Sequence, residues 1–223
     1  MAFSTQWDDC YRLQQQLSVW PWTDLVSYVM RYARPESKEW RVLELGCGAG
    51  ANIPFFQWLD VQYYAVEGSP TIVGQLVEKF PALKERIAAV DFTREIPFAG
   101  PFDLVVDRSS LTHNHTSDIK NTLSMIHSRL KQGGKFIGVD WFSTDHADYL
   151  MGEALEDSFT RDNFPSGQFA DIGVVHFSTR EHLLDLFARY TIEILDHKII
   201  RHDLPPPTAH SVFAAWNLVA KKI

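Results

Sequence analysis

A short glycine-rich segment, Gly46-Cys47-Gly48-Ala49-Gly50, constrains the fold more than any other part of the sequence. It follows directly on the apolar run Val42-Leu43-Glu44-Leu45 and precedes a helix-like stretch that begins near Asn52. Closely spaced glycines let a strand turn sharply into a helix and leave backbone N–H groups bare at the positive helix end. The segment therefore predicts a strand, a tight loop and a helix that together bind a nucleotide-like ligand.

The glycine spacing leaves two cofactor classes open. Read as Gly46-x-Gly48-x-x-Ala51, the segment also fits a relaxed dinucleotide fingerprint. Glu67 lies about 20 residues further on, where that motif places its ribose-binding acid. The rest of the chain must distinguish a dinucleotide from another nucleotide-like ligand.

Composition limits the function classes. The 223 residues are 45% hydrophobic and 22% charged, as in one globular α/β domain. A net charge of −7 and the lack of any basic cluster longer than Lys221-Lys222 argue against a nucleic-acid partner. No apolar run approaches the roughly 20 residues that span a bilayer, so we expect no membrane partner and a cytoplasmic protein. Cys10 and Cys47 are expected to be reduced thiols.

Strands and helices alternate from Arg41 onward, after two aromatic-rich helical stretches at about Trp7–Leu17 and Trp22–Ala33. Ser69-Pro70 is typical of a helix start, and Ser117 is expected to cap a helix that Gly133-Gly134 closes. The predicted strands are Arg41–Leu45, Gln62–Val66, Ile87–Val90, Phe102–Val106 and Lys135–Val139. Five strands with helical crossovers predict a parallel sheet that is buried on both faces.

The C-terminal part breaks this alternation. Ser178-Thr179-Arg180-Glu181 predicts a capping box for a helix through Tyr190, and strand-like stretches follow at Thr191–Ile200 and about Ser211–Ala220. The connection between them contains Leu204-Pro205-Pro206-Pro207 and is too short for a crossover helix. We therefore expect an antiparallel hairpin at the edge of the parallel sheet.

With this ending, the chain resembles the class I methyltransferases that use S-adenosylmethionine, over about Arg41 to Ile223. The resemblance rests on an ordered series of motifs: Glu44-Leu45-Gly46-Cys47-Gly48-Ala49-Gly50, Val66-Glu67-Gly68-Ser69, Val90-Asp91-Phe92, Phe102-Asp103-Leu104-Val105-Val106-Asp107 and Leu130-Lys131-Gln132-Gly133-Gly134-Lys135-Phe136. It implies a Rossmann-like αβα sandwich whose seven-stranded sheet has the order 3-2-1-4-5-7-6, with strand 7 antiparallel. We expect a single domain with four parts: an N-terminal helical cap (1–38), a cofactor-binding core (39–140), an insertion over the acceptor site (141–177) and a C-terminal helix and hairpin (178–223).

The resemblance also implies which residues bind the cofactor. Glu67 stands where the family's acid accepts hydrogen bonds from the ribose hydroxyls, although an acid there can also cap the next helix. Asp91 and Phe92 resemble the adenine contacts, although Asp at a strand end is also common turn chemistry. Glu44 resembles the acid that faces the charged methionine end. The full set expected at the cofactor is Glu44, Gly46, Cys47, Gly48, Ala49, Gly50, Glu67, Gly68, Ser69, Asp91, Phe92 and Asp107.

Candidate catalytic residues follow the fourth strand. Methyl transfer from a sulfonium is an in-line displacement, so a base is needed only when the nucleophile carries a proton. His113 or His115 is the candidate base, and Asp107 lies at the switch point beside the transferred methyl; the alternative is that the histidines only shape the loop. Asp107-Arg108-Ser109-Ser110 lacks the Asn/Asp-Pro-Pro-aromatic run typical of nucleic-acid amine methylation.

A site for a divalent metal ion is an alternative, because Asp107 and Asp140 end neighbouring strands and His113 and His115 lie close in the sequence. Trp141 stands where an Asn would complete the usual metal-binding pair, so we expect none. The aromatic-rich insertion, together with aromatic residues of the N-terminus, is expected to close over the carboxyl ends of the strands. The candidate substrate contacts are Arg108, Trp141, His146 and His176.

The sequence therefore predicts a methyltransferase that passes a methyl group from S-adenosylmethionine to a small molecule, releasing S-adenosylhomocysteine, with a hydroxyl or carboxyl oxygen as the expected acceptor. Two other classes stay open. One is a nucleotide-cofactor oxidoreductase, although no Tyr is followed four positions later by Lys. The other is a non-catalytic protein that binds S-adenosylmethionine.

Overall fold

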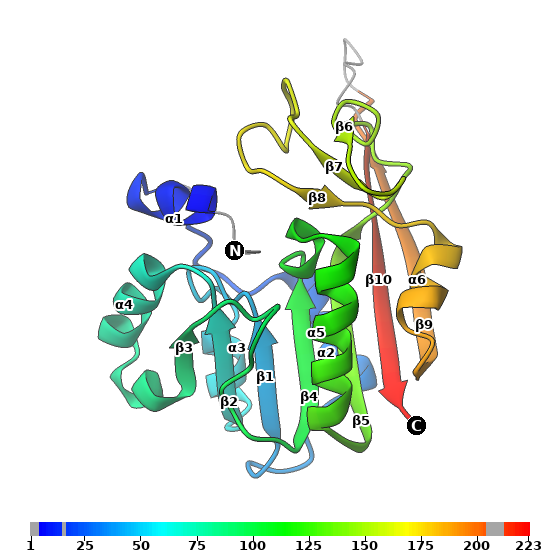
Figure 1. Ribbon diagram of the computed structural model, residues 1–223. Helices are drawn as coiled ribbons and strands as arrows, with labels where there is room; N and C mark the ends of the chain where they lie inside the picture. The colour runs from blue at the N-terminus through cyan, green and yellow to red at the C-terminus, as the bar shows by residue number, and fades with distance from the viewer. Residues whose placement is uncertain (1–4, 15–16, 204–211) are drawn as a thin grey trace.

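A computed structural model describes residues 5–14, 17–203 and 212–223, and a seven-stranded sheet runs through it in the order β3-β2-β1-β4-β5-β10-β9 (Figure 1). Its strands are β1 (Arg41–Leu45), β2 (Gln62–Glu67), β3 (Ile87–Ala89), β4 (Phe102–Arg108), β5 (Leu130–Phe142), β9 (Tyr190–Arg201) and β10 (Val212–Lys222). β9 and β10 are the sixth and seventh strands of this sheet along the chain, so the expected order is confirmed. β10 is antiparallel to both β5 and β9, which confirms the terminal hairpin.

The described residues form six α-helices, and those after the first cover both faces of this sheet. They are α1 (Thr5–Arg12), α2 (Thr23–Tyr32), α3 (Ile53–Trp58), α4 (Pro70–Lys79), α5 (Thr116–Arg129) and α6 (Arg180–Leu186), with 3-10 turns η1 (Pro81–Arg86) and η2 (Leu111–His113). Side chains alternate between the faces with the period of two of a strand. Val42 and Val106 pack with α2, α3 and α4, whereas Leu43 and Val105 pack with α5 and α6. A parallel sheet buried on both faces is what the apolar strands predict.

A second, three-stranded sheet lies in the predicted insertion: β6 (Glu153–Ala154), β7 (Thr160–Asp162) and β8 (Val175–His176). An apolar cluster holds it together, with Phe142, Phe169 and Phe177 among its members. Figure 1 shows this small sheet on one side and α1 on the other, both above the carboxyl ends of β1, β2 and β4. These two segments frame the site.

Several predicted boundaries are wrong. α5 begins at Thr116 with His115 at the N-cap, so Ser117 lies inside the helix and caps nothing. α5 ends at Arg129, and Gly133-Gly134 lie within β5, where Gly133 has a φ of 75°. β5 continues to Phe142, so Asp140 and Trp141 belong to the strand.

The last helix shifts by one residue, because the Thr179 side chain, and not Ser178, accepts the capping hydrogen bond, from the His182 backbone N–H. That helix ends at Leu186 and not at Tyr190. The Leu204-Pro205-Pro206-Pro207 connection and Ser211 lie outside the described residues, as do residues 15–16 of the first predicted helix.

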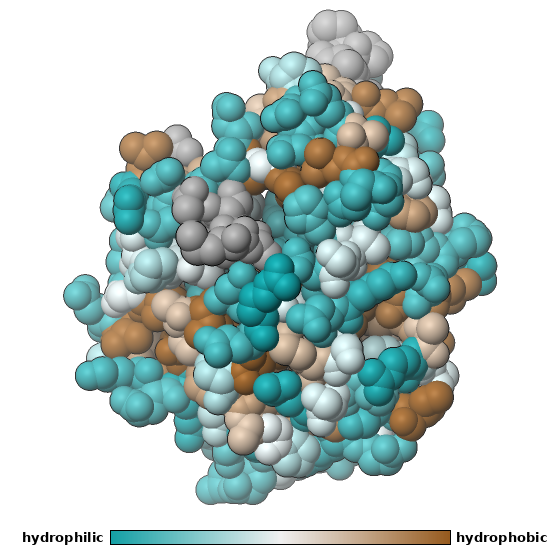
Figure 2. Space-filling model, viewed as in Figure 1, coloured by the Kyte–Doolittle hydropathy of each residue, from teal (hydrophilic) through white to brown (hydrophobic). Residues whose placement is uncertain are grey.

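Figure 2 shows the same face in space-filling form: hydrophilic side chains cover most of it, and apolar ones gather over α4 and over the small sheet. Among the described residues, none of the helices combines the length and the apolar character needed to span a membrane.

Candidate active site

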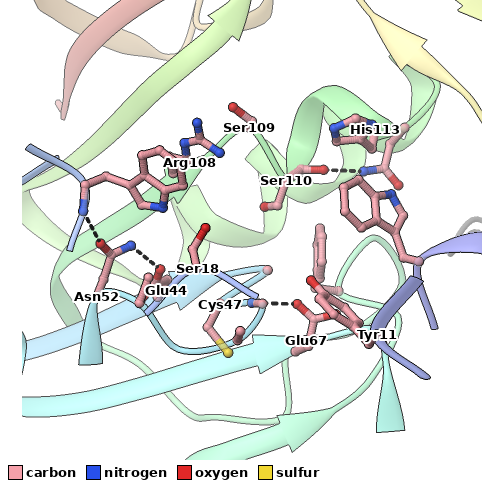
Figure 3. A pocket seen from close by; sticks show the side chains of 18 of the residues that line it. Tyr11, Ser18, Glu44, Cys47, Asn52, Glu67, Arg108, Ser109, Ser110 and His113 are labelled. Carbon is pink, nitrogen blue, oxygen red and sulfur yellow. Dashed lines mark hydrogen bonds between the residues drawn. The ribbon is translucent and has the colours of Figure 1, made fainter. Parts of the chain in front are cut away.

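A cavity of about 370 Å³ opens at the carboxyl ends of the parallel strands, where ligands bind in open α/β sheets. It lies between the glycine loop, the segment after β4, α1 and the insertion (Figure 3). The residues that line it are Trp7, Tyr11, Ser18, Trp22, Glu44, Gly46, Cys47, Gly48, Ala49, Ala51, Asn52, Glu67, Phe92, Arg108, Ser109, Ser110, His113, Asn114 and Gln168.

The glycine loop brings bare backbone to the cavity wall. Gly46 and Gly48 have φ values of 57° and 50°, which side chains rarely adopt. A Cβ added at Gly46 would lie 2.2 Å from the Ser110 Cβ, so only glycine lets the two loops meet. Cys47 is buried beside them, and burial raises the pKa of its thiol. The loop is therefore built for close packing against the segment after β4.

The amide groups of this loop are less free than the sequence suggests. Gly48 N–H donates to Glu67 Oε2 at 2.9 Å, and Cys47 N–H donates to the Val66 carbonyl at 3.3 Å. Gly50 N–H bonds back to the Cys47 carbonyl at 2.9 Å. A pyrophosphate would need these donors and would meet the Glu67 carboxylate instead. The prediction of bare N–H groups at this loop is thus wrong for these three, which are not free to bind a pyrophosphate.

Glu67 ends β2 and points into the cavity. Its Oε1 accepts from the Ser69 N–H at 3.0 Å, so two backbone donors hold the carboxylate in place. Each carboxylate oxygen has a second lone pair, and these remain for a pair of hydroxyl donors. Burial raises the pKa of Glu67 while the backbone hydrogen bonds lower it. A fixed, half-satisfied carboxylate matches the recognition of a ribose diol.

Glu44 also lines the cavity, on the side away from Glu67 (Figure 3). Only 3% of it is exposed, and its oxygens accept from Asn52 Nδ2 at 2.8 Å and from the Tyr63 hydroxyl at 2.6 Å. Burial raises the pKa of Glu44 to about 7, partly offset by these two donors. Such an acid gains most from a nearby cation, which would return its pKa to lower values.

The structure does not bring all the predicted cofactor residues to the cavity wall. Phe92 lines it, but Asp91 does not, because Asp91 Oδ1 accepts from the Thr93 N–H and hydroxyl in a local turn. Gly50, Gly68 and Ser69 also lie outside the lining, whereas Cys47 and Ala49 belong to it. Ser69 instead caps α4 by accepting from the Ile72 N–H at 3.2 Å.

Helix α1 covers the cavity from above through Trp7 and Tyr11. Its Asp8 is buried and accepts from the Ser69 hydroxyl and from the Thr71 N–H, which lowers the pKa of Asp8. The acid therefore sits at the N-terminus of α4, where the helix dipole favours a negative charge. This contact ties α1 to the core and positions both aromatic rings.

Asp107 is fully buried and does not line the cavity, contrary to its predicted contact with cofactor and methyl group. Its Oδ1 accepts from the Ser110 side chain and N–H and from the Leu111 N–H, and its Oδ2 accepts from Trp141 Nε1 at 2.6 Å. Burial raises the pKa of Asp107 to about 6. Asp107 thus shapes the segment that carries Ser109, Ser110 and His113.

Of the two candidate bases, only His113 lines the cavity. His113 lines the cavity with its ring 4.9 Å from that of Trp7, and its buried Nδ1 has no hydrogen-bond partner among the described residues. Burial lowers the pKa of His113 to about 4, so the ring is neutral at pH 7. His115 lies outside the lining, and its Nδ1 bonds to Glu156 at 2.8 Å. Of the two, the geometry favours His113.

The insertion contributes Gln168 to the lining, and the predicted contacts Trp141, His146 and His176 lie elsewhere. Trp141 is fully buried, and His146 packs among the aromatic rings of the insertion. His176 is fully buried 3.2 Å from His182, nitrogen to nitrogen. Strand extension in β5 and packing inside the insertion turn these side chains away.

Arg108, the remaining predicted substrate contact, does line the cavity. Sequence reasoning missed Ser18, Asn52, Ser109, Asn114 and Gln168. Asn52 had a signal, as the first residue of the helix-like stretch after the glycines, and Ser109 and Asn114 lie in the segment after the fourth strand that was expected to hold the catalytic residues. No group of three metal-ligating side chains gathers in the part of the chain that the structure describes.

The cavity has several features that suit S-adenosylmethionine: glycine backbone in its wall, a fixed carboxylate at Glu67, an apolar ring at Phe92 and a second carboxylate at Glu44. A family model described as "Methyltransferase domain" matches residues 14–197, most of the chain. The chain belongs to this methyltransferase family. It is a class I methyltransferase that depends on S-adenosylmethionine.

Solved structures share its fold at low sequence identity. An S-adenosylmethionine-dependent methyltransferase from Methanosarcina mazei is 13% identical with a TM-score of 0.68, covering 92% of this chain and 99% of its own. The 1,6-didemethyltoxoflavin-N1-methyltransferase from Burkholderia thailandensis, solved with its acceptor and S-adenosylhomocysteine, is 20% identical with a TM-score of 0.55, covering 83% and 72%. No curated protein matches the chain.

Fold alone does not fix the chemistry. A Rhodobacter sphaeroides protein provisionally named a Zn-dependent alcohol dehydrogenase is 15% identical with a TM-score of 0.65, covering 99% of this chain and all of its own. The methyltransferase family match separates the two classes, and the occupied amides of the glycine loop agree with it. The oxidoreductase alternative is thereby set aside.

Proposed function

We propose that this methyltransferase transfers the methyl group to a hydroxyl oxygen of a small molecule, with His113 as the base. The observation that carries this proposal is His113 in the cavity wall, a neutral ring whose buried Nδ1 has no hydrogen-bond partner within the described residues. A hydroxyl nucleophile must lose a proton as it attacks, whereas a carboxylate or a free amine needs no base. His113 therefore supports the hydroxyl over the carboxyl oxygen.

Different residues of the cavity would hold different parts of the methyl donor. Glu67 would accept from the ribose hydroxyls, Phe92 would lie against the adenine, and Glu44 would face the methionine end. When bound, S-adenosylmethionine supplies a methyl group on a positively charged sulfur, which a nucleophile can displace. The chain's own residues would then orient the acceptor and exclude water, with Trp7 and Tyr11 above and Ser109, Asn114 and Gln168 along the wall.

A small acceptor is supported by the size of the cavity, about 370 Å³ for both ligands, and by the absence of basic clusters along the sequence. The name of the Burkholderia thailandensis neighbour describes it as methylating a nitrogen of a small heterocycle. It therefore supports a small acceptor, and it does not support oxygen as the methylated atom. A cytoplasmic location stays a prediction, which cell fractionation tests.

A screen with methyl-labelled S-adenosylmethionine over hydroxylated, carboxylated and amino metabolites tests this proposal, with mass spectrometry locating the new methyl group. We expect a methyl ether. With that acceptor, His113→Gln lowers kcat by about 10²- to 10⁴-fold, the usual contribution of a general base, while S-adenosylhomocysteine affinity stays within about twofold. His115→Gln is the matched control and keeps kcat. Methylation confined to amines, or an unchanged kcat in His113→Gln, would refute the role of His113.

A further inference from the structure

Arg108 is the one Lys or Arg side chain that lines the cavity among the described residues. The reaction proposed above assigns it no role. It is the last residue of β4, two positions before Ser110, which packs against the glycine loop. In Figure 3 its guanidinium lies on the same side of the cavity as Glu44 and Asn52, while Glu67 and Tyr11 lie on the other. A carboxylate and a guanidinium thus share one end of the pocket.

A short chain of contacts joins these two charged groups. Asn52 Nδ2 donates to Glu44 Oε1 at 2.8 Å, and Asn52 Oδ1 accepts from the Trp22 N–H at 3.1 Å. The Arg108 guanidinium carbon lies 3.6 Å from the centre of the Trp22 ring, a close cation–π contact. Asn52 and Trp22 therefore fix Glu44 and Arg108 relative to each other, although the four residues come from four different segments.

Neighbouring side chains fix Glu44 and Arg108 in position, and Arg108 keeps N–H donors that can bind a ligand in the cavity. Asp140 Oδ2 accepts from Arg108 Nε at 3.2 Å and lies 3.1 Å from Nη2, and Lys198 bonds the other oxygen of Asp140 at 2.9 Å. A guanidinium has five N–H donors, so three remain beyond those on Asp140. No ion pair joins Arg108 to Glu44 in the described parts of the chain. Glu44 and Arg108 are thus both available to one ligand.

We propose that Glu44 and Arg108 form a clamp for the zwitterionic amino-acid end of the methyl donor, with Arg108 binding its α-carboxylate. An amino acid carries an ammonium and a carboxylate on one carbon, so its receptor needs opposite charges close together, as found here. An acidic acceptor would use Arg108 alone and leave the buried Glu44 without a cation. The proposal rests on the donor orientation given under the proposed function, and is independent of the acceptor atom and of His113.

Calorimetric titration tests the clamp without any acceptor. The first ligand is S-adenosylhomocysteine. The second is 5′-S-(3-aminopropyl)-5′-thioadenosine, in which hydrogen replaces the carboxyl group, and the third is 5′-methylthioadenosine, which lacks both charged groups. We expect the wild-type protein to bind S-adenosylhomocysteine about 10- to 100-fold more tightly than the aminopropyl compound, the usual effect of a hydrogen bond between charged groups. In Arg108→Met this ratio should fall to about threefold or less.

Because the ratio of the two affinities is measured within each protein, a general loss of stability in Arg108→Met does not change it. Arg108→Lys should give an intermediate ratio, because lysine keeps the positive charge but lacks the two parallel N–H donors of a guanidinium. Lys198→Met is the matched control: it removes the other cation on Asp140, lies outside the cavity lining and should keep the wild-type ratio.

A wild-type ratio near one overturns the clamp, as does an equal weakening of both compounds in Arg108→Met. Loss of the ratio in Lys198→Met would also overturn it, because the effect would then belong to the Asp140 network. Failure of the donor orientation is recognised separately: Glu67→Ala would leave 5′-methylthioadenosine binding unchanged.

Discussion

The buried carboxyl group of Glu44 should leave a measurable mark on how the stability of the protein without ligand depends on pH. Glu44 is 3% exposed, and burial raises its pKa from the usual 4.5 to about 7. Glu44→Gln keeps the size and shape of the side chain and cannot ionise. Its amide can still accept from Asn52 and donate to Tyr63, so the variant isolates the cost of the charge.

The sign follows from counting protons. Between pH 4.5 and 7 the folded protein keeps the Glu44 proton while the unfolded chain has lost it, so the free energy of unfolding falls as pH rises through this window. The full penalty is about 3.4 kcal/mol at about 1.36 kcal/mol per unit, and about 2.5 kcal/mol of it develops between pH 5 and pH 8. Relative to wild type, Glu44→Gln should therefore gain about 2.5 kcal/mol over that interval.

Urea unfolding of both proteins at pH 5 and pH 8, followed by circular dichroism, measures this difference. Glu78→Gln is the matched control, because Glu78 is exposed on α4 and should show no such gain. A stability difference between Glu44→Gln and wild type that is constant to about 0.5 kcal/mol across both pH values would refute the reasoning, because Glu44 would then be as charged in the folded protein as in the unfolded chain.

Two further predictions test the anchoring of the site. Glu67→Ala should weaken S-adenosylhomocysteine binding at least about tenfold by calorimetry, because it removes the ribose acceptor and frees the Gly48 N–H; unchanged affinity would remove Glu67 from the site. Trp141→Phe should lower the free energy of unfolding by about 2 kcal/mol or more, because the buried Asp107 loses a donor at 2.6 Å. Trp216→Phe loses a bond to the neutral Ser178 carbonyl and should cost about 1 kcal/mol, so equal losses would contradict the ranking.

Local patterns were enough for most of the fold. The strands that became β1, β2 and β4 are apolar runs bounded by turn residues, and their parallel order follows from the helices between them. The short proline-containing connection predicted the terminal hairpin. Helix boundaries were less accurate: Ser117 and Ser178 looked like caps, but His115 and Thr179 have the extended backbone that a cap requires. A capping side chain is therefore not enough to predict a cap: the backbone decides which residue takes that position, and His115 takes it without a side-chain hydrogen bond.

The sequence by itself determined the donor side of this protein, because the glycine loop, Glu44 and Glu67 lie at strand ends, and strand ends of a parallel sheet meet at one edge. Only the tertiary structure decided which neighbours reach the cavity. Asp107 and His176 are turned into the core, His115 pairs at the surface with Glu156, and Asn52 and Gln168 arrive from other segments. The physical reason is that a side chain's direction depends on packing and hydrogen bonds with residues far along the chain, which no local pattern contains.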